Sequence, residues 1–394
     1  MTSARRISPA LIFSAITLAV SALCSFSSTA HAQRWSDVIE QQISLLETHL
    51  GRLEAVGSSS AASGGQQTGE HRPARAEIGA GAVLKLGSTG ARASLLAAKL
   101  EAQGYLKPGY RSDEVDGVVE AALKAFQSAN GITPDGKAGE ETVAILDQDT
   151  TKTAQAIRAT LPRMRALLAD LPEDVAIVNL PSQNLVLLRA GTVALTMDTA
   201  VGRPSRPTPL LTDEMTHIIV NPTWTVPQGI MKADKLPNLR RKASPGISNA
   251  SVWLDGDLVN PANVNWNQVS PGRIRIVQSP GDHNALGRLK FNLTNGENIY
   301  MHDTNEPKVF AKSNRAVSSG CVRLSKPRDL AQEILSHQGI SPERISAMIE
   351  SGKTQWIKLD TPLPIRFIYW TAMVDTQGHL RIYRDIYDMD AVNS

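Results

Sequence analysis

The chain has 394 residues, of which 42% are hydrophobic, so it is long enough for two to three domains with sizeable cores. Its formal net charge at pH 7 is only +3, and no basic tract argues for a nucleic-acid partner. It has two cysteines, Cys24 and Cys321.

Residues 1–32 have the pattern of a targeting segment. Arg5 and Arg6 precede an apolar run at 10–23, and Ala30-His31-Ala32 is a small-x-small cleavage site. The run is shorter than the roughly 20 residues of a membrane-spanning helix. We therefore predict a signal peptide that is cleaved before Gln33 and exports the protein, with an uncleaved anchor as the alternative.

Cleavage would remove Cys24 and leave Cys321 as the single cysteine of the mature chain. One cysteine cannot form an internal disulfide, which also argues against a disulfide oxidoreductase. Free cysteines are often buried and inert. Cys321, however, follows Ser318-Ser319-Gly320 and precedes Val322-Arg323, a polar context that favours a reactive thiol.

Three segments with different patterns follow the signal. Residues 33–57 carry one apolar stripe at helical spacing and predict a packing helix. Residues 58–80 are rich in Ser, Gly, Ala and Gln and predict a flexible linker. Residues 81–148 predict a small domain of three helices, and residues 149–173 a connector helix that Pro162 interrupts.

The pattern of the three-helix segment is LxxGxxG, then GY, then DG, then AxxxFQxxxGIxxDGxxGxxT. It closely resembles the peptidoglycan-binding repeat domain of cell-wall enzymes, and this resemblance implies anchoring to the wall rather than chemistry. The alternative is a generic three-helix module.

From residue 174 to 394 the periodicity changes to short strands separated by Gly/Pro turns, with helices at 327–339 and 342–350. The fold class expected is therefore multidomain α+β, with a small three-helix domain and a β-rich sandwich. Between about 226 and 286 the chain is irregular and rich in Pro, Asn, Gly and basic residues. A loop of this length is usually functional or disordered, so we predict a lid over the site, with a plain surface insertion as the alternative.

His302 and Cys321 are the candidate base and nucleophile. A strand-like run at 298–301 leads to His302, and the polar loop after it ends at Gly320. A neighbouring imidazole can accept the thiol proton, and either the carboxylate or the backbone carbonyl of Asp303 could orient that imidazole. Gly320 lets the backbone come close, so the amides of Gly320 and Cys321 can point at an oxyanion.

Arg323 could hold a substrate carboxylate, or it could form a structural ion pair, for instance with Asp329. No CxxC or HxxxH spacing supports a metal site, and no cofactor is expected. The other substrate-binding candidates around the cysteine loop are Ser318, Ser319, Thr304 and Trp224.

HDTN at 302–305 and SSGCVRL at 318–324 resemble the signature of L,D-transpeptidases with a YkuD-type catalytic domain. The similarity extends over residues 175–390 and is greatest for the larger, periplasmic branch with a wall-binding domain and a lid. It implies that Cys321 is the nucleophile, His302 the base and the carbonyl of Asp303 the orienter. Ser319 departs from the family, because many members have His or Arg there. The helical scaffold is also shorter than in that branch, which leaves the bracing of the lid in question.

The resemblance implies that Cys321 attacks the diaminopimelate–D-Ala bond of a tetrapeptide stem and passes the acyl group to an amine of another stem. A carboxypeptidase, in which water is the acceptor, and attachment of an outer-membrane protein to peptidoglycan use the same thioester. A non-catalytic wall-binding scaffold protein is the alternative of another class. The periplasm or cell envelope is the expected location.

Overall fold

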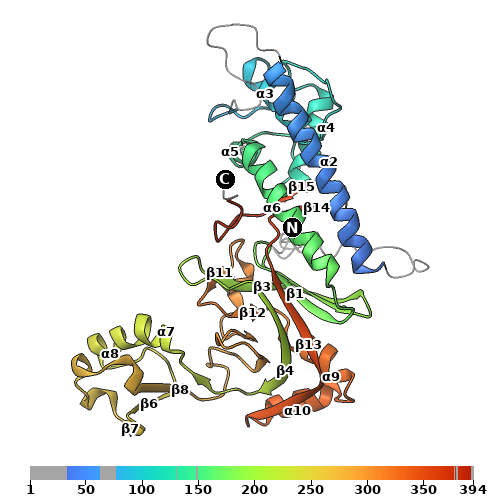
Figure 1. Ribbon diagram of the computed structural model, residues 1–394. Helices are drawn as coiled ribbons and strands as arrows, with labels where there is room; N and C mark the ends of the chain where they lie inside the picture. Colours follow the sequence, from blue (N-terminus) through green and yellow to red (C-terminus); the bar gives the residue numbers. More distant parts are fainter. Residues whose placement is uncertain are drawn as a thin grey trace, which may run out of the picture. The chain divides into compact units, whose positions relative to one another are not determined.

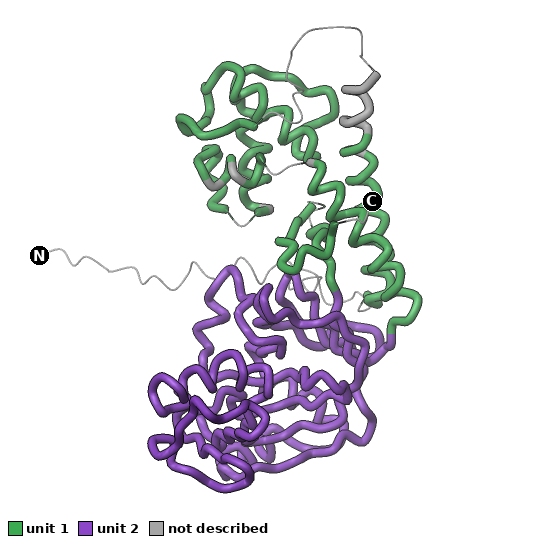
Figure 2. Tube along the Cα trace, turned by 60° about the vertical axis from the view of Figure 1, so that its left-hand side comes forward, with its two compact units in different colours: residues 1–171, 369–394 green, residues 172–368 purple. Residues whose placement is uncertain are grey.

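Figure 2 divides the chain into two units. The computed structural model describes residues 33–62, 77–130, 132–147, 150–376, 378 and 380–391. The first unit holds the described residues up to 171 together with those from 369 onward, and the second holds residues 172–368. The predicted signal peptide and most of the predicted linker lie outside the described residues. In the described part, no helix has the length and apolarity that crossing a membrane requires.

Two long helices and a short β-hairpin form the scaffold of the first unit (Figure 1). Helix α2 (Trp35–Ala62) packs against α6 (Thr150–Ala169), and both contact β14 (Ala372–Val374), which pairs with β15 (Leu380–Ile382). Helix α2 runs beyond its predicted end at 57, because the next five residues contain neither Gly nor Pro. Pro162, expected to interrupt the second helix, lies inside a continuous α6.

The last residues of the chain belong to this scaffold. Gln42 of α2 donates to the carbonyl of Val374 at 2.7 Å and accepts from its N–H at 2.8 Å. Trp370 is buried and stacks on Trp35, with ring centroids 6.0 Å apart. The predicted catalytic domain at 174–394 therefore ends at 368 in the structure, because the tail buries its aromatic side chains in the first unit.

The three helices predicted at 81–148 are confirmed as α3 (Ala91–Ala102), α4 (Gly117–Ala129) and α5 (Glu140–Leu146). Asp116 caps α4 by accepting from the N–H groups of Val118 and Val119, both at 2.9 Å. This module has its own core, in which four large side chains are fully buried: Leu96, Leu100, Leu123 and Phe126.

The second unit is built on one nine-stranded sheet, in the order β11-β3-β12-β10-β9-β4-β13-β1-β2. Because β2 also pairs with β3, the sheet closes on itself. The β-rich character was predicted, but this closure was not, since it joins strands whose local patterns carry no pairing information. The strands are β1 (Val175–Asn179), β2 (Asn184–Arg189), β3 (Thr192–Gly202), β4 (Leu211–Val220), β9 (Leu289–Leu293), β10 (Met301–His302), β11 (Ala316–Ser318), β12 (Val322–Leu324) and β13 (Gln355–Ile368). Helices α9 (Pro327–Ser336) and α10 (Pro342–Glu350) lie where helices were predicted.

Residues 226–286, hereafter the insertion, are structured, and their expected irregularity is wrong. A four-stranded sheet has the order β5-β8-β6-β7, beside a helical stretch that runs through α7, a π-helical turn η2 and α8 (Figure 1). Met231, Leu239, Trp266 and Ile276 are buried in a separate core. Ile274 and Ile276 alternate along β8, but the other core residues are spread over short elements that share no single period, which is why the sequence did not reveal this core. Strand β5 (Trp224–Thr225) directly precedes the insertion, and the elements within it are α7 (Gln228–Ile230), η2 (Met231–Lys235), α8 (Leu236–Lys242), β6 (Ala250–Leu254), β7 (Asp257–Val259) and β8 (Ile274–Gln278).

Candidate active site

Strand pairing brings the two halves of the motif together. Strands β10 and β12 are parallel neighbours, with Met301 opposite Val322 and His302 opposite Arg323. Cys321 directly precedes β12, so it lies at the end of the strand beside the one that carries His302. On the other side of β10, His302 is opposite Lys290 of β9.

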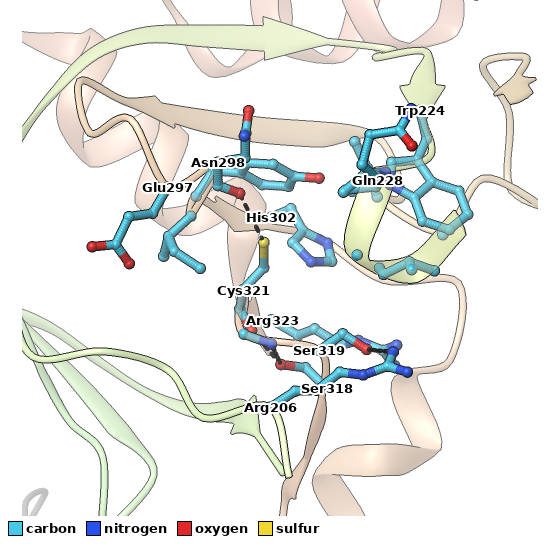
Figure 3. A pocket seen from close by; sticks show the side chains of 18 of the residues that line it. Arg206, Trp224, Gln228, Glu297, Asn298, His302, Ser318, Ser319, Cys321 and Arg323 are labelled. Atoms are coloured by element: carbon cyan, nitrogen blue, oxygen red, sulfur yellow. Dashed lines mark hydrogen bonds between the residues drawn. The ribbon is translucent and has the colours of Figure 1, made fainter. Parts of the chain in front are cut away.

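Cys321 and His302 both point into a cavity of about 770 Å³ (Figure 3). Its lining includes the turn at 318–321, the loop at 297–302, the helical start of the insertion, the loop at 206–209 and residues 285–286. Of the predicted site residues, the structure places seven along this cavity: Cys321, His302, Gly320, Arg323, Ser318, Ser319 and Trp224.

His302 is buried, and its Nδ1 lies 2.5 Å from the backbone carbonyl oxygen of Asp303. A carbonyl only accepts, so Nδ1 carries the hydrogen and Nε2 is the nitrogen able to accept a proton. Burial, reinforced by the charges of Arg323 and Lys290, lowers the pKa of His302 to about 3. The imidazole is therefore neutral at pH 7.

The carboxylate of Asp303 bonds the backbone and not the imidazole. Its two oxygens accept from the backbone N–H of Arg288 at 2.8 Å and of Thr304 at 2.7 Å. Of the two orienting groups considered from the sequence, the carbonyl is thus the one that contacts the imidazole, and the carboxylate fastens the loop around it. Burial raises the pKa of Asp303.

The Cys321 side chain is half-buried, and its Sγ lies 3.6 Å from the carbonyl oxygen of Asn298. Burial raises the pKa of the Cys321 thiol, while hydrogen bonds from Tyr300 and the charges of Lys290 and Arg323 oppose that rise. Thiol and imidazole are therefore both uncharged in the resting site, rather than a preformed thiolate–imidazolium pair.

The turn before the nucleophile is fastened from within. Gly320 has φ +115°, which favours glycine, and its N–H donates to Ser318 Oγ at 3.2 Å. Ser318 Oγ in turn donates to the carbonyl of Cys321 at 2.6 Å. The N–H of Cys321 has no hydrogen-bond partner within the part of the chain that the structure describes. Of the two amides predicted to face an oxyanion, only that of Cys321 is therefore unoccupied, and Gly320 serves to shape the turn.

Two further predicted residues make local contacts. Arg323 forms the structural ion pair that was one of its two expected roles, with Glu306 at 2.8 Å in place of Asp329, and it also lines the cavity. Thr304 is not among the cavity-lining residues, because its hydroxyl turns back to accept from the N–H of Glu306 at 3.1 Å.

The structure adds Tyr300 and Lys290 to the site. The Tyr300 ring is buried, and Lys290 Nζ lies 4.1 Å from its centroid. Two signals could have found them: Tyr300 is two positions before His302 and so shares its side of an extended strand, and Lys290 is a basic residue on a strand of the same domain. Among the described residues, no cluster of three His, Cys, Asp or Glu side chains could hold a metal ion.

Comparison with known proteins identifies the two folded parts. Residues 173–353 match the family model described as "L,D-transpeptidase catalytic domain" (YkuD). This part of the chain is therefore similar to YkuD-type L,D-transpeptidase catalytic domains. Residues 89–146 match the model described as "Putative peptidoglycan binding domain".

A curated relative from Haemophilus influenzae, described as "Putative L,D-transpeptidase", is 36% identical over 221 residues. The match covers 54% of this chain, which spans only 44% of the relative's length. Solved structures of L,D-transpeptidases are more distant. That of Mycobacterium tuberculosis L,D-transpeptidase 1 is 14% identical, covers 50% of this chain and 61% of its own, and has a TM-score of 0.22. The structure from Xylanimonas cellulosilytica is 13% identical, covers 73% of this chain and 98% of its own, and has a TM-score of 0.19.

Proposed function

We propose that this protein is a peptidoglycan L,D-transpeptidase that works through a thioester at Cys321. The observation that carries the proposal is the convergence of a half-buried thiol, a neutral imidazole and an unoccupied backbone amide in one cavity. These are a nucleophile, a base and an oxyanion donor, the three groups that acyl transfer requires. The matches to a catalytic and a peptidoglycan-binding family support the substrate class.

In the first half-reaction, Cys321 Sγ attacks the carbonyl between diaminopimelate and D-Ala of a tetrapeptide stem, and the thiol proton passes to His302 Nε2. The N–H of Cys321 donates to the oxyanion. The C–N bond breaks, and D-Ala leaves as an amine with the proton from His302, so that a thioester remains.

In the second half-reaction, the side-chain amine of a diaminopimelate on another stem attacks the thioester. His302 accepts the amine proton and returns it to the departing sulfur, which restores the thiol and leaves a 3→3 cross-link. The amide is replaced by an amide through a thioester, so no energy source is needed. We place the reaction in the periplasm, on the signal-like pattern of residues 1–32.

The test is product analysis after incubation of the pure protein with a disaccharide tetrapeptide. We expect a 3→3 dimer and free D-Ala, both absent with Cys321→Ala. Tripeptide without dimer would indicate a carboxypeptidase. A stem joined by an amide to the lysine of an added protein, without any stem dimer, would indicate attachment of a protein. Failure to release D-Ala from any stem would overturn the proposal.

A further inference from the structure

The two adjacent serines before Gly320 have opposite hydrogen-bonding states. The hydroxyl hydrogen of Ser318 is used within the turn, since it is donated to the carbonyl of Cys321, and Ser318 Oγ also accepts from the N–H of Gly320. Ser319 only accepts hydrogen bonds: its Oγ accepts from Arg203 Nη2 at 2.8 Å and from Arg206 Nη1 at 3.1 Å.

A serine hydroxyl has two acceptor lone pairs and one donor hydrogen. The guanidinium groups of Arg203 and Arg206 fill both lone pairs of Ser319 Oγ, because arginine can only donate. The hydroxyl hydrogen must therefore go elsewhere, and no atom of the described residues accepts it. Ser319 lines the same cavity as Cys321, so this hydrogen is available to a bound molecule.

The two arginines are held by a rigid loop. Gly202 is the last residue of β3. A Cβ at this position would lie only 2.3 Å from the carbonyl oxygen of Arg206, so the close turn of the loop at 202–208 requires glycine here. The N–H of Arg206 donates to the carbonyl of Arg203 at 2.8 Å. The hydroxyl of Thr208 then donates to the carbonyl of Gly320 at 2.7 Å, which joins this loop to the nucleophile turn.

Charge around Ser319 favours an anion. Asp234 of the insertion holds Arg206 through two hydrogen bonds, at 2.7 and 2.8 Å. The ionised groups that line the cavity are three cations and two carboxylates, which are Arg206, Lys235, Arg323, Asp234 and Glu297. Arg323 is paired with Glu306, which is not among the lining residues, and Arg203 adds a positive charge in hydrogen-bond contact with the Ser319 hydroxyl. A hydroxyl polarised by two cations is a stronger donor to a carboxylate than to a neutral oxygen.

We propose that the Ser319 hydroxyl binds a carboxylate of the donor stem next to the scissile bond, and that Arg203 and Arg206 are positioning residues that aim its hydrogen into the cavity. This inference rests on the proposed function and specifies how the donor is selected. The tetrapeptide presents two carboxylates near the attacked carbonyl: that of the terminal D-Ala and the side-chain carboxylate of diaminopimelate. The shared chemistry is the carboxylate, and the experiment separates the two sources.

The experiment measures kcat and KM for D-Ala release from three donors: the tetrapeptide, its form amidated at the terminal carboxylate and its form amidated at the diaminopimelate side chain. The wild type should prefer the free carboxylate over one of the amidated forms by roughly tenfold or more, mainly through KM. Ser319→Ala should reduce that preference by about threefold or more, and Ser319→Thr, which keeps the hydroxyl, should restore it. Arg203→Gln and Arg206→Gln should reduce it too.

Ser336→Ala is the matched control, since the Ser336 hydroxyl lies on α9 and bonds only the carbonyl of Glu333. It should keep the wild-type preference. The inference is overturned, with the proposed function intact, if the wild type turns over all three donors equally or if Ser319→Ala keeps the full preference. If no donor releases D-Ala with wild-type protein, the proposed function itself fails.

Discussion

The resting thiol and imidazole are both neutral, and this determines how the site responds to pH. Burial raises the pKa of Cys321, so the thiolate forms only as pH rises through that raised value. Burial also lowers the pKa of His302 to about 3, so the imidazole does not change charge near neutrality. We expect the alkylation rate of Cys321 to rise with pH with a midpoint at or above that of an ordinary thiol, measured with iodoacetamide. A midpoint well below that of an ordinary thiol would contradict the neutral pair.

Tyr300 opposes the rise in the thiol pKa through its hydrogen bonds to Cys321. Tyr300→Phe removes the phenol donor, so the alkylation midpoint should move up by about one pKa unit and D-Ala release should slow roughly tenfold. Tyr110→Phe is the control, because it removes a phenol hydrogen bond to Asp116 in the first unit. An unchanged midpoint in Tyr300→Phe would show that the phenol does not stabilise the thiolate.

The carbonyl of Asp303, and not its carboxylate, orients His302. His302→Ala should lower the rate of D-Ala release by roughly two to four orders of magnitude, because the general base is lost. Asp303→Asn should cost much less, about tenfold, since the backbone carbonyl remains and the amide oxygen can still accept from one loop N–H. Steady-state rates on the tetrapeptide test this, and equal losses in the two variants would assign the orienting role to the carboxylate.

At the scale of residues, the sequence predicted the nucleophile and base because both lie in short contiguous motifs. It did not predict Arg203, Arg206 or Lys290, since each reaches the site through pairing or loop geometry between distant segments. Thr304 was placed in the site by its nearness to His302 in the chain, but its hydroxyl closes a local turn instead.

At the scale of elements, the insertion contributes Gln228, Ile230, Asp234 and Lys235 to the lining of the cavity. Its position was predicted from composition, but its core was not, because several short elements assemble that core and no single regular stripe marks it. We expect it to limit access of water to the thioester and so to favour an amine acceptor. Deleting part of α8 is a poor test, since Leu236 and Leu239 belong to the core of the insertion.

A point change in the ion pair between Asp234 and Arg206 tests this role more cleanly. Asp234→Asn weakens the attachment of the insertion at the cavity, so the ratio of hydrolysed to cross-linked product should rise by about threefold or more. Asp255→Asn is the matched control, because it breaks the ion pair with Arg273 in the same insertion, away from the cavity lining. Product ratios from chromatography would contradict the role if both variants matched the wild type.

For the whole molecule, the segment at 77–147 has its own core, so we expect the rest of the chain to fold without it. A variant lacking residues 77–147 should bind purified sacculi much less, while it still releases D-Ala from small soluble stems. The full-length Cys321→Ala protein should bind sacculi as the wild type does but release no D-Ala. A pull-down with sacculi measures the binding of both variants. Equal binding with and without the module would contradict its anchoring role.

The order of domains along the chain could be predicted, because linkers, helices and strands differ in composition. The return of residues 369–394 to the first unit could not, since the burial of Trp370 against Trp35 joins the two ends of the chain. The closure of the sheet by β2 and β3 depends likewise on pairing that only the folded chain shows.

The proposed reaction passes through a thioester on Cys321, which intact-protein mass spectrometry can detect. Wild-type protein mixed with disaccharide tetrapeptide and quenched rapidly in acid should gain the mass of the stem less D-Ala. Peptide mapping should place the adduct on Cys321, and Cys321→Ala should gain no mass. An adduct on any other residue, or cross-linking that persists in Cys321→Ala, would show that Cys321 is not the nucleophile.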